Sequence, residues 1–215
     1  MSKRKRWDNC GLCGEFKITT REHVVPKCLY PPSKATSKFQ RIIIAACSEC
    51  NNGTADDDAH FRNVILVAGD ATDAVNEIWH GAARRAFAEV DGKRRLKDLF
   101  ALMKPAPDAG PDRYRIYPAD DERILRIVRK VVRGLSKHHG LPSPIKDHQV
   151  FADVMRFAIP GEILGAMHFE SAEPDIFDYR YLLLSEPSYT QSIWVLRFFQ
   201  RTSFVAMVLD ANADN

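Results

Sequence analysis

The sequence predicts an α+β fold in which a small cysteine-rich unit precedes a helical region that ends in an antiparallel β-hairpin or small sheet. Two C-x-x-C pairs flank a polar segment near the start of the chain. Further on, residues 121–138 repeat their apolar side chains with helical spacing, and residues 179–209 alternate as strands do. We expect a first domain over residues 1–70 and a second, α+β domain over residues 71–215.

The two C-x-x-C pairs predict a structural zinc site. Two tight turns supply four thiolates to a tetrahedral Zn2+ at bond lengths of about 2.3 Å. Two disulfides or a redox pair are the alternatives, but no apolar leader follows the first residue, so we expect a reducing cytoplasm, in which zinc is favoured. Cys28 is expected to be a small packed side chain and not a ligand. The four predicted ligands are Cys10, Cys13, Cys47 and Cys50.

Two strands and a helix are expected around these cysteines. One strand should start at residues 23–25, and the β-branched run at 41–46 should pair with it as an antiparallel hairpin. A helix should begin near Ala55, because Thr54 and Asp57 have the spacing of a capping box. Its buried face is expected to consist of Phe61, Val64, Ile65 and Ala68.

The remainder of the chain alternates helical and extended patterns. The apolar repeat at residues 121–138 is the clearest helix, and Gly140 should end it. The tail should form strands separated by turns near residues 186–188 and 201–202, and its last hairpin should be the floor on which the helices pack. Trp194, Phe198 and Phe199 are expected in this core. Further helices are expected at 73–90, at 94–103 and within 149–158, with a linker at 104–111 and a short strand at 113–117.

The charge of the chain is uneven. The net charge is +3, but residues 1–41 contain ten Lys or Arg against three acidic residues, so this segment carries +7 and the rest −4. A basic segment beside a zinc unit is typical of proteins that bind the phosphates of nucleic acid. For residues 3–6, a solvated arm without a partner is the alternative. The predicted nucleic-acid-binding residues are Lys3, Arg4, Lys5, Arg6, Lys27, Lys34, Lys38 and Arg41.

Three short motifs between and around the cysteines resemble the HNH endonuclease family. They are C-G-L-C at 10–13, E-H-V-V-P at 22–26 and C-S-E-C-N at 47–51, and the resemblance covers about residues 10–62. It implies a ββα-metal unit, which is a hairpin packed on a helix with a divalent ion between them. In this chain zinc would staple the ends of that unit.

The resemblance also implies roles for single residues in the hydrolysis of DNA. His23 would be the general base that deprotonates water, Glu22 a ligand of a catalytic Mg2+ or Mn2+, and Asn51 the last family position. A histidine can take a proton near neutral pH, and a hard ion on carboxylate and amide oxygens can neutralise developing negative charge. Asp57 and His60 are possible additional ligands of the ion, or else a helix cap and a helix residue at the edge of the hairpin.

One family position departs from the pattern. The middle Asn, which orients the histidine, falls where this chain has Ile42, and Gln40 is the nearest amide. A zinc-stapled module that binds nucleic acid without cutting it is therefore an alternative, and a third reading places the function in the C-terminal region. The presence of Glu22 next to His23 favours the nuclease, because a zinc staple alone has no need of this pair.

The second region is expected to serve the first. It can position DNA, a protein partner or a second copy of the chain, and no apolar run approaches the roughly 20 residues of a membrane span. The helix at residues 121–138 should present a solvated basic face that can extend a DNA track. This face would consist of Arg126, Arg129, Lys130 and Arg133.

Overall fold

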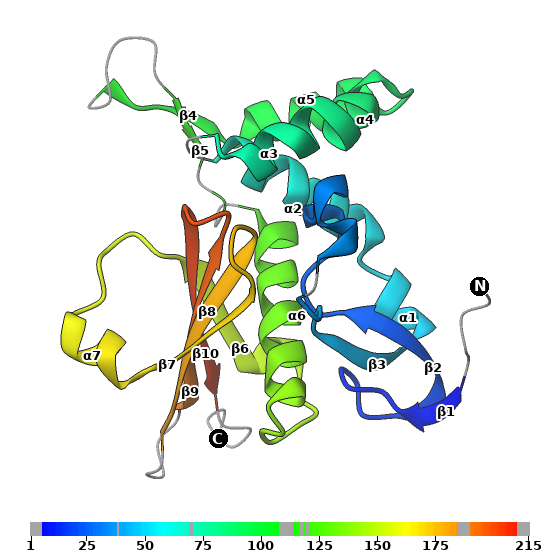
Figure 1. The fold of residues 1–215 in the computed structure, drawn as a ribbon, viewed down its shortest axis with the longest axis vertical. Helices are drawn as coiled ribbons and strands as arrows, with labels where there is room; N and C mark the ends of the chain where they lie inside the picture. The colour runs from blue at the N-terminus through cyan, green and yellow to red at the C-terminus, as the bar shows by residue number, and fades with distance from the viewer. Residues whose placement is uncertain are drawn as a thin grey trace.

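A central helix separates an N-terminal cysteine-rich segment from a C-terminal sheet (Figure 1). The computed structural model describes residues 6–37, 39–68, 71–107, 114–116, 118, 121–184 and 190–209. It contains helices and antiparallel sheets, which confirms the predicted mixture of the two.

Three antiparallel strands form the N-terminal sheet, in the order β1 (Arg6–Asn9), β2 (Phe16–His23), β3 (Ile43–Cys47). The predicted hairpin is present, with His23 opposite Ile43. However, the strand ends at His23 and does not start there. Pro26 has no N–H to donate, and the chain turns into the 3-10 helices η1 (Lys27–Leu29) and η2 (Pro32–Thr36).

Two helices follow strand β3, and the first of them contains Cys50. The short helix α1 (Ser48–Asn52) was not predicted, whereas α2 (Ala55–Val67) begins at the predicted residue. The predicted capping box is wrong, because the Thr54 side chain makes no cap hydrogen bond and instead accepts one from Lys130. The predicted inner face of α2 is fully buried at Phe61, Val64 and Ile65. The ring of Phe61 meets that of Phe198 edge-on, at 5.1 Å between centroids. This contact joins the N-terminal segment to the C-terminal sheet.

The next part of the chain forms a helical layer at the top of Figure 1. Its predicted division near Asp91 and Gly92 is present, because α5 begins at Gly92. The strands β4 and β5 pair with each other, and β4 lies where a linker was predicted. The elements are α3 (Asp73–Ile78), the π-helical turn η3 (Trp79–Ala83), α4 (Arg84–Ala88), α5 (Gly92–Ala101), β4 (Met103–Pro105) and β5 (Tyr114–Ile116).

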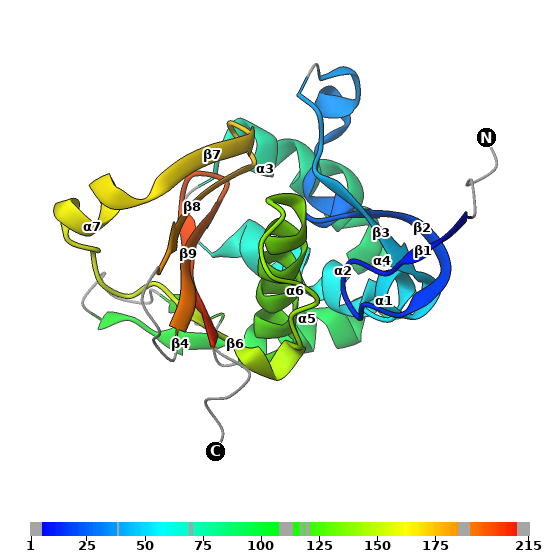
Figure 2. The same ribbon diagram turned by 90° about the horizontal axis from the view of Figure 1, so that it is seen from below.

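The central helix α6 (Glu122–His138) matches the predicted range within one residue. The side chain of Asp121 caps its first turn by accepting a hydrogen bond from the N–H of Arg123, and Gly140 follows its end with a φ of 68°. Helix α6 contacts α2 and β3 on one side and β6 and β10 on the other. Figures 1 and 2 both show it between these two layers. Both sides of α6 are therefore covered.

The C-terminal sheet has five strands in the order β6-β10-β9-β8-β7, all antiparallel to their neighbours. The prediction of a helix within residues 149–158 is wrong, because residues of this segment form strand β6, which pairs with β10. Pairing with a distant strand overrides local preference in such a short segment. The elements are η6 (Asp147–Gln149), β6 (Val150–Val154), α7 (Gly161–Ala166), β7 (His168–Glu173), β8 (Phe177–Leu183), β9 (Thr190–Phe198) and β10 (Thr202–Leu209).

The predicted last hairpin is β9 and β10, and α6 packs against its β10 strand. A turn at residues 199–201 joins the two strands, next to the predicted position, whereas residues 186–188 lie outside the described part. Trp194, Phe198 and Phe199 are fully buried, as expected. One cluster of buried apolar side chains includes residues from both sides of residue 70. Across the described residues, no helix has the length and apolar character needed to cross a membrane.

Candidate functional site

The four cysteines of the two C-x-x-C pairs lie together. Their Sγ atoms are all within 4.8 Å of one another, and those of Cys13 and Cys47 are 4.0 Å apart. Four thiolates on one zinc ion are separated by about 3.8 Å, which follows from tetrahedral geometry at bond lengths of about 2.3 Å. None of the four is in a disulfide. The cluster can therefore hold a zinc ion.

Backbone turns hold these thiols in place. Gly14, at a φ of 80°, closes the first turn through a hydrogen bond from its N–H to the carbonyl of Cys10. The N–H groups of Cys13 and Cys47 both donate to the Cys10 Sγ, at 3.5 and 3.4 Å. Burial raises the pKa of the Cys10 thiol, but these hydrogen bonds outweigh burial and lower the pKa to about 7. At Cys10 the turns thus favour the thiolate, which is the form that binds metal.

Cys28 lies apart from the cluster, as predicted. It belongs to η1, and its thiol donates a hydrogen bond to the carbonyl of Asp58 at 3.3 Å. Burial raises its pKa to about 12, so it stays protonated.

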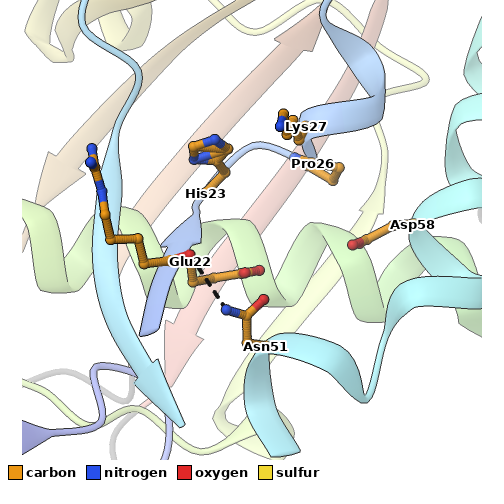
Figure 3. Close-up of a pocket in the computed structure, with 7 residues that line it drawn as sticks. Glu22, His23, Pro26, Lys27, Asn51 and Asp58 are labelled. Atoms are coloured by element: carbon orange, nitrogen blue, oxygen red, sulfur yellow. Dashed lines mark hydrogen bonds between the residues drawn. The ribbon is translucent and has the colours of Figure 1, made fainter. Parts of the chain in front are cut away.

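A pocket of about 450 Å³ opens beside the end of β2 (Figure 3). Strand β2, the start of η1 and helices α1 and α2 contribute its lining. In Figure 3 the side chains of Glu22, Asn51 and Asp58 lie toward one another across this space. The residues that line it are Arg21, Glu22, His23, Pro26, Lys27, Asn51 and Asp58. All three residues for which catalytic roles were predicted are among them.

Asn51 is anchored to β2 by its amide nitrogen. The Nδ2 atom donates to the Thr20 hydroxyl at 2.8 Å and lies 3.4 Å from the carbonyl of Arg21. Its amide oxygen is turned away from the strand, on the side of the pocket where Asp58 lies (Figure 3). Asn51 can therefore offer an oxygen to a hard cation.

The two carboxylates of the pocket share a buried lysine from α6. The Nζ atom of Lys130 lies 2.6 Å from Glu22 Oε1 and 3.7 Å from Asp58 Oδ2. Glu22 is only 7 % exposed and Lys130 only 5 %. Burial raises the pKa of Asp58 to about 6, and the negative charges of Glu22 and Asp57 add to this effect while Lys130 opposes it. The pocket thus holds two carboxylates that share the ammonium group of Lys130.

His23 is half-buried and held neutral. Burial lowers its pKa, and the positive charges of Arg41, Lys27, Arg21 and Lys130 lower it further. Its Nδ1 atom is buried and has no hydrogen-bond partner among the described residues. Ile42, where an orienting Asn was expected, accepts a backbone hydrogen bond from Val24 and has no polar side-chain atom for His23.

The structure does not bring Asp57 and His60 into this pocket. Asp57 accepts a hydrogen bond from Arg126 at 2.7 Å, and His60 pairs with Asp121 at 2.8 Å. Asp58 faces the pocket instead, because successive helix residues point about 100° apart. Three consecutive acids in α2 indicated that a carboxylate could face the hairpin, but not which one.

The four predicted nucleic-acid-binding residues that the structure describes are dispersed. Lys27 lines the pocket, while Arg6 is exposed and paired with Asp8. Lys34 pairs with Asp175 at 3.1 Å, and the guanidinium of Arg41 lies 4.1 Å from the centre of the Tyr30 ring. Arg21, which was not predicted, joins Lys27 at the pocket. Outside the described part of the chain lie Lys3, Arg4, Lys5 and Lys38.

The predicted solvated basic face on α6 is present only in part, because of its four residues Arg126 alone is exposed. Lys130 is buried, and Arg126 is bonded to Asp57. Arg129 donates to Asp147 at 2.8 Å, and Arg133 donates to the carbonyl of Leu12 at 2.9 Å. Because α6 is covered on two sides, these cations connect it to its neighbours. The position of Lys130 among Val128, Val131 and Val132 was the one signal of burial in the sequence.

Comparison of the chain with protein-family models, with curated proteins and with solved structures finds no match. The pocket and the cysteine cluster are thus the basis for inferring a function.

Proposed function

We propose that this protein is a metal-dependent endonuclease of the HNH type that hydrolyses phosphodiester bonds in DNA. One observation carries the proposal, which is the convergence of Glu22, His23, Asn51 and Asp58 on one pocket from separate segments of the chain. The same set combines a neutral base with hard oxygen donors. The cysteine cluster would bind structural zinc and so hold the β3 and α1 segment that carries Asn51.

His23 is suited to the role of general base. Burial and the neighbouring cations keep its ring neutral, so that it can accept a proton from water near neutral pH. Arg21 and Lys27, which line the same pocket, attract the negatively charged phosphate. Both the proton acceptor and the anion-binding groups thus lie where a phosphodiester would enter.

Glu22, Asn51 and Asp58 suit a divalent ion. Carboxylate and amide oxygens are the ligands that Mg2+ and Mn2+ prefer. In addition, Asp58 Oδ1 is buried and has no hydrogen-bond partner among the described residues, which leaves a lone pair for a ligand. An ion held there would neutralise the charge that develops on the phosphate and the leaving oxygen.

A second candidate function is a zinc-stapled module that binds nucleic acid without cutting it. The unpartnered His23 Nδ1 favours this reading, because a general base must be held in orientation and Ile42 offers no acceptor. Both proposals share the zinc cluster and the basic lining of the pocket. They differ only in whether water is activated.

Plasmid cleavage distinguishes these two functions. Purified protein would be incubated with supercoiled plasmid and Mg2+ or Mn2+, with a chelator as the metal-free control. We expect the wild type to nick the plasmid and the cleavage rate of His23→Ala to be about 10²- to 10⁴-fold lower, which is the usual contribution of a general base to the rate. His138→Ala is the matched control, because His138 is an exposed histidine at the end of α6 that does not line this pocket.

Each outcome assigns the protein to one reading. Cutting that survives His23→Ala would exclude His23 as the base. DNA binding by the wild type without any cutting would instead support the non-catalytic module.

A further inference from the structure

Lys130 is a buried charged group beside the pocket that has no part in the proposed catalysis. It lies on α6, far along the chain from the motifs that resemble HNH nucleases. Its ammonium group contacts Glu22 and Asp58 and donates to the Thr54 hydroxyl at 2.8 Å. A lysine that is only 5 % exposed is costly unless it is paired, and these contacts offset that cost.

Helix α6 holds this ammonium in a fixed position. Arg133, one turn further on, donates to the carbonyl of Leu12 in the first cysteine turn. At Gly134, helix α6 and the segment after β2 are so close that an added Cβ atom would lie 2.9 Å from a methyl group of Val24, the residue next to His23. The helix therefore cannot withdraw from β2 without breaking several contacts, and Lys130 stays behind the two carboxylates.

The positive charge of Lys130 has opposite effects on the pocket with and without a divalent ion. Without an ion, the ammonium offsets part of the repulsion between Glu22 and Asp58 and so keeps both in the pocket. With an ion bound, the same ammonium is a positive charge close to a doubly positive one, and the two repel.

We propose that Lys130 is a built-in counter-ion that positions Glu22 and Asp58 and weakens the binding of a divalent ion to them. This inference rests on the ion site that the proposed function places at Glu22, Asn51 and Asp58. The protein would hold the carboxylates in place at all times yet bind the ion reversibly. The C-terminal region thereby supplies one residue that tunes the site of the N-terminal segment.

Mn2+ binding to the full-length, zinc-loaded protein tests this proposal without measuring activity. The dissociation constant would be obtained by calorimetry and by the loss of the free Mn2+ signal in electron paramagnetic resonance. We expect Lys130→Met to bind Mn2+ about tenfold more tightly, which corresponds to the Coulomb repulsion in water between a unit and a divalent charge about 6 Å apart. Damage to the fold would change the affinity in the opposite direction.

Three further variants isolate the effect of the charge. Lys130→Arg keeps the charge and should keep an affinity close to that of the wild type. Lys137→Met removes a lysine from the same helix at an exposed position and should have no effect. Glu22→Gln should abolish Mn2+ binding and so locate the ion. If Lys130→Met does not fold, Lys130→Gln is the substitute, because its amide can still donate to Thr54.

Equal Mn2+ affinity in Lys130→Met and the wild type would overturn the inference and leave the nuclease proposal to the plasmid assay. Weaker binding would also overturn it. Absence of Mn2+ binding in every variant would refute the ion site itself, and with it both the inference and the metal-dependent nuclease.

Discussion

Glu22 and His23 are neighbours in the chain but have different environments. Glu22 is buried against Lys130, whereas His23 stands at the end of β2, where the strand gives way to η1. The end of the strand matters, because side chains within a strand point to opposite faces and adjacent residues would be separated. At this position both residues reach the same pocket.

The charged form of the Asp58 carboxylate destabilises the folded protein when no ion is bound, as expected of a residue that serves as a ligand. Its pKa of about 6 in the folded protein lies above the ordinary value of 3.8. Between these two values the folded state binds more protons than the unfolded state, so stability falls as the pH rises from about 4 to about 6. At neutral pH the charged carboxylate therefore destabilises the fold.

Asp58→Asn should stabilise the protein when no Mg2+ or Mn2+ is added. The free energy of unfolding at pH 7 should rise by at most about 3 kcal/mol, because each unit of the raised pKa of Asp58 corresponds to about 1.4 kcal/mol. This increase should vanish near pH 4. Urea unfolding of the zinc-loaded protein at several pH values measures it. Asp56→Asn, at an exposed position in the same turn, is the control and should show no such gain. A less stable Asp58→Asn variant at pH 7 would contradict the prediction.

The elements that carry the site are short. Helix α1 has five residues and β3 has five, and neither length is stable alone in water. The cysteine cluster links the turn between β1 and β2, the end of β3 and the first turn of α1. Zinc bound there would hold together elements that have little stability of their own.

Cys47→Ser should therefore lose zinc and lower the melting temperature markedly, because three thiolates and a hydroxyl bind zinc weakly. Asn51 would lose its fixed position, so divalent-ion binding should fall as well. Zinc content by mass spectrometry of metals, together with thermal unfolding, provides the measurement. Cys28→Ser is the matched control, since Cys28 is outside the cluster and serine can keep the hydrogen bond to Asp58. Full zinc content in Cys47→Ser would refute the staple.

At the scale of the whole molecule, α6 belongs to two layers at once. It packs on α2 and β3 with one side and on β6 and β10 with the other. Phe61, Val64 and Ile65 of α2 have no exposed surface in the full chain. The N-terminal segment thus buries its apolar face against residues that lie far along the chain.

A fragment of residues 1–70 should not fold, even with zinc. Removal of α6 and the sheet exposes several fully buried side chains, and each exposure costs about 1.5–3 kcal/mol. The summed cost is comparable to the whole free energy of unfolding of an ordinary protein, about 5–15 kcal/mol. Two-dimensional NMR of the zinc-loaded fragment, with the full chain as reference, measures this. A well-dispersed spectrum from the fragment would show that residues 1–70 are an independent domain.

Much of the fold was predictable because its signals are local. Nearly all of α6 follows from its apolar spacing and its cap residue, and the start of α2 and the last hairpin follow from apolar spacing and turn residues within each segment. Strand β6 was not predictable, because its five residues are extended only through pairing with β10. The strand β4 was missed for a similar reason, as it is a short strand that ends in a proline.

The sequence by itself determined the chemistry that the site can contain. The spacing of the two cysteine pairs, the pair Glu22 and His23, and Asn51 after the last cysteine are set by covalent neighbours. The structure brings the four thiols together and places the other three residues around one pocket. Only the tertiary structure decided that Asp58 and not Asp57 faces the pocket, and that Lys130 lies behind it. The physical reason is that these two choices depend on how α2 rotates against β2 and where α6 docks, and both are set by packing between segments far apart in the chain.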